Sequence, residues 1–180
     1  MMADYDPMLL ERASLVKMLA LDVDGILTDG RLYFDSQGNE MKAFHTRDGL
    51  GLKALQKFGI ELALITGRSS PMVAARAEQL GIRHVYQGRD DKLEAYLDLI
   101  GKTGLEHEHV CYAGDDWIDL PVLIRVGLAI AVPDAEEHVR RRVHWVTRRG
   151  GGHGAVREIC DLILTAQGHD QVLLDGYLSS

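Results

Sequence analysis

The sequence predicts a doubly wound α/β domain built on a parallel β-sheet, and three observations support this fold class. Short apolar runs alternate along the chain with amphipathic helical patterns, which is the order of elements in such folds. Several runs are apolar almost throughout, as strands covered by helices on both faces must be. Glycines that can end a helix follow several of the helical patterns. With 180 residues and no linker or internal repeat, we expect one domain over residues 1–180.

The first expected strand, residues 18–23, leads into a small β-hairpin at residues 31–45. Two extended stretches there flank the turn sequence Ser36-Gln37-Gly38-Asn39. The hairpin is too small to be a cap domain, so we expect a Rossmann-like sheet without one.

The remaining elements alternate regularly. A helix at 50–58 stops at Gly59, strand 60–66 follows, and a helix at 71–80 stops at Gly81. Strand 84–87 precedes helix 92–100, and strand 109–113 precedes helix 120–126, which stops at Gly127. The last elements are strand 128–132, helix 135–142, strand 144–147 and helix 155–166. Residues 169–180 have weak periodicity, and we expect a loose tail.

Composition and charge exclude several classes of protein. Apolar residues make up 46% and charged residues 26%, which excludes a disordered chain, and no apolar run reaches the length that spans a bilayer. The excess of 27 acidic over 20 basic residues disfavours a nucleic-acid binder. The first residues lack the pattern of a secretory signal, so we expect a cytoplasmic protein. Cys111 and Cys160 are expected to be reduced core thiols.

Two carboxylates, Asp22 and Asp24, end the first expected strand, where open α/β sheets place their ligand crevice. Gly25 permits a turn that brings the second carboxylate round. Like charges this close need a cation or a proton to offset them. An acidic turn without function is the alternative at this motif.

A second acidic cluster, Asp115, Asp116 and Asp119, follows the strand at 109–113. Helix capping explains one of these carboxylates and the helix dipole tolerates another. The remainder indicates a hard divalent cation with oxygen ligands. Neither cluster has a His or Cys companion at zinc spacing, so Mg²⁺ is the expected ion.

Thr66 and Lys92 also stand at the carboxyl ends of expected strands. Thr66-Gly67 opens a helix and offers a hydroxyl and free backbone N–H groups to a phosphate. Lys92 would neutralise phosphate oxygens. Taken alone, Thr66 is equally well explained as a helix cap and Lys92 as a solvated charge. Four such sites at one edge of the sheet are harder to explain without function.

The motifs Asp22-Val23-Asp24-Gly25, Thr66-Gly67, Lys92 and Gly114-Asp115-Asp116 resemble the four motifs of the haloacid dehalogenase (HAD) superfamily of phosphatases. Further stretches, at residues 22–30, 31–45, 44–49 and 150–158, are similar to the capless family of 3-deoxy-D-manno-octulosonate 8-phosphate (KDO 8-phosphate) phosphatases. The resemblance implies hydrolysis of KDO 8-phosphate, in the synthesis of lipopolysaccharide.

The resemblance also implies a mechanism. Asp22 would attack phosphorus and form an aspartyl-phosphate. Asp24 would protonate the departing alkoxide and then deprotonate the attacking water. Thr66 and Lys92 would hold the transferring phosphoryl oxygens.

The metal ligands implied by the resemblance are Asp22, Asp115 and the backbone carbonyl of Asp24, with Mg²⁺ as the ion. Asp116 and Asp119 would orient the waters of the metal or the side chain of Lys92.

Substrate binding is expected from Thr28, Gly67, Arg68 and Arg76. Phosphatases of nine-carbon ulosonic acid 9-phosphates typically carry an acidic residue at the position of Arg68 and Lys at that of Gln79. The residues present here therefore favour the eight-carbon acid, with the nine-carbon phosphatase as the alternative.

The resemblance further implies assembly. Members of the capless group form tetramers in which a neighbour's hairpin covers the mouth of the active site. We therefore expect residues 31–45 at a subunit interface of a homotetramer, and residues 150–154 near a neighbouring active site. His153 stands where Arg is common in the family.

Two other classes of protein share part of this pattern. Response-regulator receiver domains also accept phosphate on Asp, but their acceptor lies on a middle strand and their acidic pair on the first. A non-catalytic HAD-like scaffold is disfavoured because every catalytic position is intact.

Overall fold

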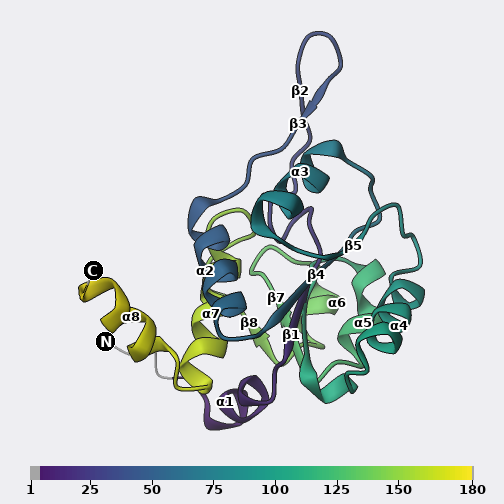
Figure 1. The fold of residues 1–180 in the computed structure, drawn as a ribbon. Coiled ribbons are helices and arrows are strands. Elements are labelled where there is room, and N and C mark those ends of the chain that lie inside the picture. Colours follow the sequence, from purple (N-terminus) through teal and green to yellow (C-terminus); the bar gives the residue numbers. More distant parts are fainter. Residues whose placement is uncertain (1–4, 180) are drawn as a thin grey trace.

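The computed structural model describes residues 5–179, which form a parallel sheet of six strands in the order β5-β4-β1-β6-β7-β8 (Figure 1). The fold class predicted from the sequence is therefore confirmed. The strands are β1 (Met18–Leu21), β4 (Glu61–Ile65), β5 (His84–Tyr86), β6 (Val110–Ala113), β7 (Leu128–Ala131) and β8 (Trp145–Val146). Each falls within an expected strand. All residues of β1, β6 and β7 are buried, which explains why their sequences are apolar without alternation.

Strand β1 lies at the centre of the sheet and determines where the site can form. Its last residue, Leu21, pairs with Leu64 of β4 on one side and with Ala113 of β6 on the other. The chain order changes direction across β1, because β4 and β5 extend one way and β6 to β8 the other. The loops that follow β1, β4 and β6 consequently leave the sheet side by side, at the edge where such folds bind ligands.

Helices cover both faces of the sheet (Figure 1). Helices α2 (Thr46–Lys57) and α7 (Ala155–Ala166) pack against each other on one face, and α4 (Lys92–Thr103) and α5 (Leu120–Leu123) lie together on the other. Helices α3 (Pro71–Leu80) and α6 (Glu137–Arg140), with the 3₁₀ helices η1 (His107–His109) and η2 (Trp117–Asp119), complete the connections. Helix α2 begins earlier than expected because the His45 side chain caps it, accepting a hydrogen bond from the Arg47 N–H at 3.2 Å.

One helix was not predicted. Helix α1 (Pro7–Ser14) begins at an Asp-Pro start signal: the Asp6 carboxylate accepts a hydrogen bond from the Met8 N–H at 2.8 Å, and proline occupies the first turn. The helix buries Leu9 and Ala13.

The prediction of a loose tail at residues 169–180 was wrong over most of that segment. Helix α8 (Asp170–Leu178) follows Gly168, whose φ of +71° ends α7. The ring of His169 stacks on that of Phe58 with centroids 4.2 Å apart, which fixes where α8 starts. No described residue of α8 is buried, so the helix lacks the apolar periodicity by which a sequence reveals a helix.

The expected β-hairpin is present as β2 (Tyr33–Phe34) and β3 (Glu40–Met41), and it projects from the body at the top of Figure 1. Tyr33 pairs with Met41 in an antiparallel register. The Asp35 carboxylate closes the turn by accepting hydrogen bonds from Gln37 and Asn39. Within residues 5–179, nothing larger is inserted between β1 and α2.

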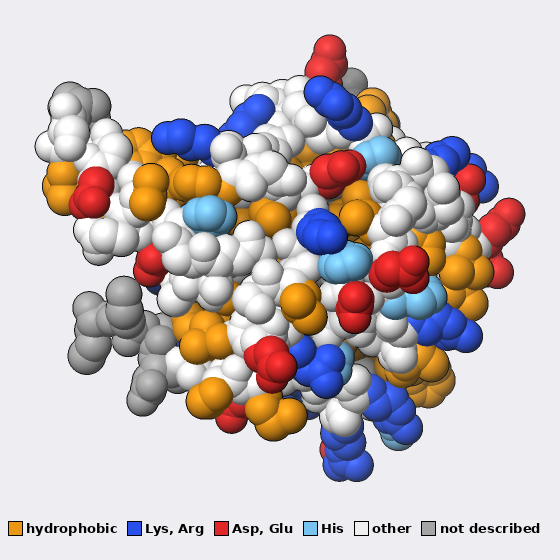
Figure 2. Space-filling view, turned by 60° about the horizontal axis from the view of Figure 1, so that its bottom comes forward, with side chains coloured by type: hydrophobic (Ala, Val, Ile, Leu, Met, Phe, Trp, Pro, Cys, Tyr) orange, Lys and Arg blue, Asp and Glu red, His pale blue; other side chains and the backbone are white. Residues whose placement is uncertain are grey.

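Acidic and basic side chains are interspersed on the face turned toward the bottom of Figure 1, as Figure 2 shows. Among the described residues, no helix combines the length and apolar character needed to cross a membrane. Cys111 and Cys160 are both buried and unpaired, as expected.

Candidate active site

The loop after β1 presents Asp22 and Asp24 at the edge of the sheet. The Asp22 N–H donates to the Ala113 carbonyl at 3.0 Å and so continues the strand pairing. The Val23 carbonyl then accepts from the N–H groups of three successive residues, 26–28, at 2.9–3.2 Å, which holds a tight turn. Gly25 makes this turn with a φ of +92°. The turn leaves the Asp22 side chain buried and that of Asp24 21% exposed.

The loop after β6 is organised around Asp119, which is fully buried. One of its carboxylate oxygens accepts hydrogen bonds from the N–H groups of Asp115 (3.1 Å) and Asp116 (3.2 Å). The other accepts from the Tyr112 hydroxyl at 2.6 Å and from Lys92 at 2.7 Å. Asp116 in turn caps η2. Asp119 therefore fixes the loop that carries Asp115.

Lys92 is held between two carboxylates. It begins α4, which Asp91 caps, and its ammonium lies 2.9 Å from Asp22 Oδ1 and 2.7 Å from Asp119 Oδ1. Burial alone would lower the pKa of Lys92, but these two carboxylates raise it above its ordinary value. Lys92 is consequently a fixed positive charge directly beside Asp22.

A divalent cation fits beside Asp22 and Asp115. Oxygens of Asp22, Asp115 and Asp119 lie within 4.8 Å of one another. Burial, followed by repulsion from the neighbouring carboxylates, raises the pKa of Asp22 to about 6 and that of Asp115 to about 8. A Cβ at residue 25 would lie 2.1 Å from Asp115 Oδ2, so Gly25 makes room for this carboxylate. Since Asp119 is already bonded to Lys92 and Tyr112, Asp22 and Asp115 are the carboxylates left to bind a hard cation.

Thr66, Gly67 and Arg68 complete the pocket from the end of β4. The pocket encloses about 250 Å³, and its lining residues come from the loops after β1, β4 and β6. The Arg68 N–H donates to the Thr66 hydroxyl at 3.3 Å. The residues that line the pocket are Asp22, Asp24, Gly30, Thr66, Gly67, Arg68, Asp115, Asp116 and Ile118.

Three residues expected to contact substrate, Thr28, Arg76 and Lys92, are not among the residues that line this pocket. Lys92 lies behind Asp22. The Thr28 hydroxyl accepts hydrogen bonds from the N–H groups of Gly25 (3.4 Å) and Gly30 (3.2 Å), and so holds the loop itself. The guanidinium of Arg76 lies over the ring of Phe44, 5.8 Å from its centroid, and donates to Gln79 at 2.7 Å.

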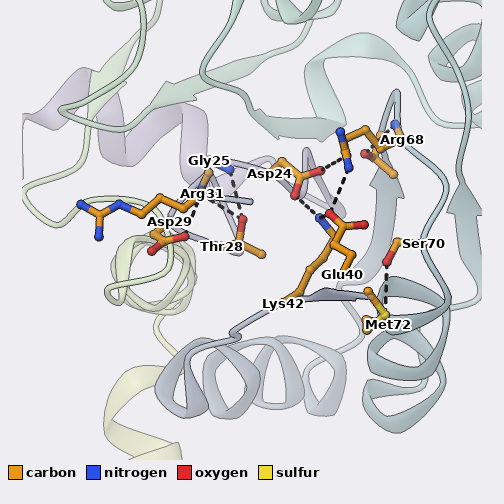
Figure 3. A network of polar contacts seen from close by, with 12 residues as sticks. Asp24, Gly25, Thr28, Asp29, Arg31, Glu40, Lys42, Arg68, Ser70 and Met72 are labelled. Carbon is orange, nitrogen blue, oxygen red and sulfur yellow. Dashed lines mark hydrogen bonds and ion pairs between the residues drawn. The ribbon is translucent and has the colours of Figure 1, made fainter. Parts of the chain in front are cut away.

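Two hairpin residues that no sequence motif indicates, Glu40 and Lys42, also reach the site. The Lys42 ammonium lies 2.5 Å from Asp24 Oδ1 and 3.3 Å from Glu40 Oε1. Arg68 Nη2 lies 3.0 Å from Glu40 Oε1 (Figure 3). The spacing of Glu40 and Lys42 in an extended stretch places them on one face, but no local signal points to Asp24, 18 residues earlier.

The glycine-rich segment packs against the loop after β1 within the same chain. The Gly152 N–H donates to the Ile26 carbonyl at 3.1 Å. A Cβ at Gly151 would lie 1.8 Å from the Gly25 carbonyl oxygen and 2.8 Å from that of Thr28. Glycine is therefore required where the segment supports the loop that carries Asp24.

Comparison with known proteins gives a consistent result. Residues 47–127 match the model of the haloacid dehalogenase-like hydrolases. The chain is 49% identical over 158 residues to the 3-deoxy-D-manno-octulosonate 8-phosphate phosphatase KdsC of Yersinia pestis, a match that covers 88% of this chain and 84% of that protein.

Two crystal structures are similar over nearly the whole chain. A probable YrbI family phosphatase from Pseudomonas syringae is 47% identical, with a TM-score of 0.94 over 96% of this chain and 98% of that one. KDO 8-phosphate phosphatase from Moraxella catarrhalis, solved with magnesium, phosphate and KDO, is 46% identical, with a TM-score of 0.94 over 96% of this chain and 99% of that one. With the four motifs assembled at one edge of the sheet, these similarities show that the chain belongs to the KDO 8-phosphate phosphatase family of haloacid dehalogenase-like hydrolases.

Proposed function

We propose that this chain hydrolyses KDO 8-phosphate to KDO and inorganic phosphate through an aspartyl-phosphate on Asp22. The proposal rests on the position of the Asp22 carboxylate, which lies 2.9 Å from the Lys92 ammonium and beside the carboxylate of Asp115. The identity of 49% to a KDO 8-phosphate phosphatase supports the choice of substrate over a nine-carbon analogue.

In the first step, a carboxylate oxygen of Asp22 bonds to phosphorus as the bond from phosphorus to the ester oxygen breaks. Asp24 gives its proton to the departing alkoxide. In the second step, water attacks phosphorus, Asp24 takes up the water's proton, and the bond from phosphorus to Asp22 breaks to release phosphate. Lys92 and Thr66 hold the phosphoryl oxygens in both steps, so positioning and charge provide most of the acceleration.

We propose Mg²⁺ as the metal, held by Asp22, Asp115 and the backbone carbonyl of Asp24. When bound, it would offset the repulsion between the Asp22 carboxylate and the phosphate dianion. Asp116 and Asp119 would then orient the waters of the metal and the side chain of Lys92, respectively.

Arg68 is the residue we propose to bind the carboxylate of the sugar acid. It lines the pocket, its side chain is 48% exposed, and one of its nitrogens is paired with Glu40. A guanidinium matches the planar shape of a carboxylate better than an ammonium does. Comparing kcat/KM for eight- and nine-carbon ulosonate phosphates tests this assignment, and preference for the nine-carbon substrate would refute it.

We further propose a cytoplasmic homotetramer in which the hairpin at residues 31–45 covers a neighbour's active site. The hairpin exposes four apolar side chains, Leu32, Tyr33, Phe34 and Met41, which are 38–57% accessible. Burial in an interface would remove this surface from water. A fully active monomer in size-exclusion chromatography would contradict the proposal.

The catalytic proposal is tested by replacing Asp22. The Asp22→Asn variant should fold normally, because the amide is isosteric, yet lose turnover because it is a poor nucleophile. Substantial retained activity would refute the assignment, and full activity in EDTA would refute the role of the metal. Steady release of phosphate without a stable phosphoprotein would distinguish this enzyme from a receiver domain.

A further inference from the structure

We propose that Lys42 is a positioning residue for Asp24, which holds the carboxyl group of the acid/base in place from the foot of the hairpin. This inference rests on the acid/base role proposed above for Asp24.

The contact between Lys42 and Asp24 is short and enclosed. Lys42 Nζ lies 2.5 Å from Asp24 Oδ1, and the Lys42 side chain is 2% exposed. Figure 3 shows Lys42 reaching from the end of the hairpin to Asp24 and Glu40. An ammonium with so little access to water is favoured when it is paired with carboxylates, and here two carboxylates pair with it, at 2.5 and 3.3 Å.

The hairpin's strand geometry produces this arrangement. Side chains alternate between the two faces of an extended chain, so Glu40 in β3 and Lys42, the residue after β3, share one face and Met41 lies on the other. The exposures agree, since the Glu40 and Lys42 side chains are 18% and 2% exposed and Met41 is 53% exposed. The face of the hairpin's foot that carries Glu40 and Lys42 is therefore directed at the active site of the same chain.

The Asp24 side chain needs a contact to hold it, because the hydrogen bonds of the loop after β1 fix the backbone at Asp24 but leave its carboxylate free to rotate. In the described chain, the cations in contact with its carboxylate are Lys42 and, at 3.8 Å, Arg68. A rotatable carboxylate loses efficiency as a proton donor when it is not held in hydrogen-bond reach of the leaving oxygen. Lys42 restricts that rotation.

Direct binding of the substrate's carboxylate by Lys42 is the competing interpretation. The enclosure of its side chain and its two carboxylate partners argue against it. Arg68, at 48% exposed, is the accessible cation of this network. Lys42 therefore acts through Asp24.

The test compares two substrates with different leaving groups, because general acid catalysis by Asp24 speeds the reaction only when the leaving oxygen must be protonated. In the full-length enzyme with Mg²⁺, Lys42→Met should lower kcat for KDO 8-phosphate about 10²-fold, the lower range for loss of general acid catalysis. With p-nitrophenyl phosphate, whose phenolate leaves without a proton, the first turnover should stay as fast as in the wild type. Slow hydrolysis of the phosphoenzyme should then give a nitrophenolate burst of about one per active site.

A double-mutant cycle tests whether the effect passes through Asp24. In an Asp24→Asn background, Lys42→Met should cause no further loss of kcat. Equal slowing of the first turnover with both substrates, or additive losses in the cycle, would overturn the inference. If Asp24→Asn alone retained full activity on KDO 8-phosphate, the acid/base assignment would fail instead.

Two further variants separate positioning from folding. Lys102→Met removes an equally direct Lys–Asp pair, 2.6 Å long but exposed on α4, and should leave both activities unchanged. If Lys42→Met melts below the assay temperature, Lys42→Gln allows the same comparison, because it retains an N–H donor but with shorter reach. A Lys42→Gln enzyme with unchanged turnover of KDO 8-phosphate and no burst would also overturn the inference.

Discussion

Replacing Asp119 with alanine tests the idea that one buried carboxylate organises the site. The substitution removes the acceptor shared by the Tyr112 hydroxyl and the Lys92 ammonium, at 2.6 and 2.7 Å. It also frees the N–H groups of Asp115 and Asp116. We expect both stability and activity to fall, because the same groups support the fold and position Lys92.

The size of the effect follows from which partners remain buried. The Tyr112 hydroxyl has no access to water, and leaving such a donor unsatisfied costs about 1–3 kcal/mol. Lys92 keeps Asp22 as a partner, so it loses only part of the roughly 3–5 kcal/mol that breaking a buried ion pair costs. A total near 4 kcal/mol corresponds to a fall in Tm of about 10 °C for a chain of this size.

Thermal unfolding followed by circular dichroism, with kcat measured on the same samples, gives the answer. Asp98→Ala is a matched control, because Asp98 also accepts from a tyrosine (Tyr86, 2.8 Å) and a lysine (Lys102, 2.6 Å), but on the surface. Water replaces those contacts, so the control should melt like the wild type. An Asp119→Ala variant that melts within about 2 °C of the wild type would refute the reasoning.

Three further predictions concern the metal, the glycine segment and the hairpin. Burial and repulsion raise the pKa of Asp22 to about 6 and of Asp115 to about 8. Because both carboxyl groups ionise more readily in the unfolded chain, the free energy of unfolding of the metal-free protein should fall as pH rises from about 4 to about 8. The difference in Tm between Mg²⁺ and EDTA should grow over that window, and a constant difference would contradict the metal assignment. Gly151→Ala should lower the free energy of unfolding by about 1–3 kcal/mol, measured by urea unfolding, and should reduce activity, measured by phosphate release. Gly101→Ala is the control: a Cβ there meets open space, so the variant should lose neither stability nor activity. Met41→Asp should shift size-exclusion elution toward the monomer while circular dichroism shows an unchanged fold at the assay temperature; unchanged elution would argue against a hairpin interface.

The sheet was predictable because its strands are apolar without alternation and its helices end at glycine. These signals are local, and they placed the loops after β1, β4 and β6 at one edge, where the pocket lies. The contact of Lys42 with Asp24 was not predictable, because it depends on how the hairpin folds back over 18 residues. Likewise, the sequence of the glycine segment does not reveal that Gly151 abuts the Gly25 carbonyl. Helix α8 escaped prediction because it buries no described residue.

The two faces of the hairpin would contribute to catalysis in different ways, one by positioning Asp24 and the other by contacting a neighbouring chain. The face that carries Glu40 and Lys42 supplies Lys42 to Asp24 within one chain, so the proposed acid/base needs no neighbour to be positioned. The opposite face carries Tyr33 and Met41, which pair across the two strands and remain exposed, and in the proposed tetramer a neighbouring chain would cover it. Assembly should therefore exclude water and retain substrate, whereas Lys42 should govern proton transfer. A folded monomer should therefore show a raised KM and an unchanged dependence of turnover on the leaving group. A Lys42 variant should show an unchanged KM and a changed dependence of turnover on the leaving group.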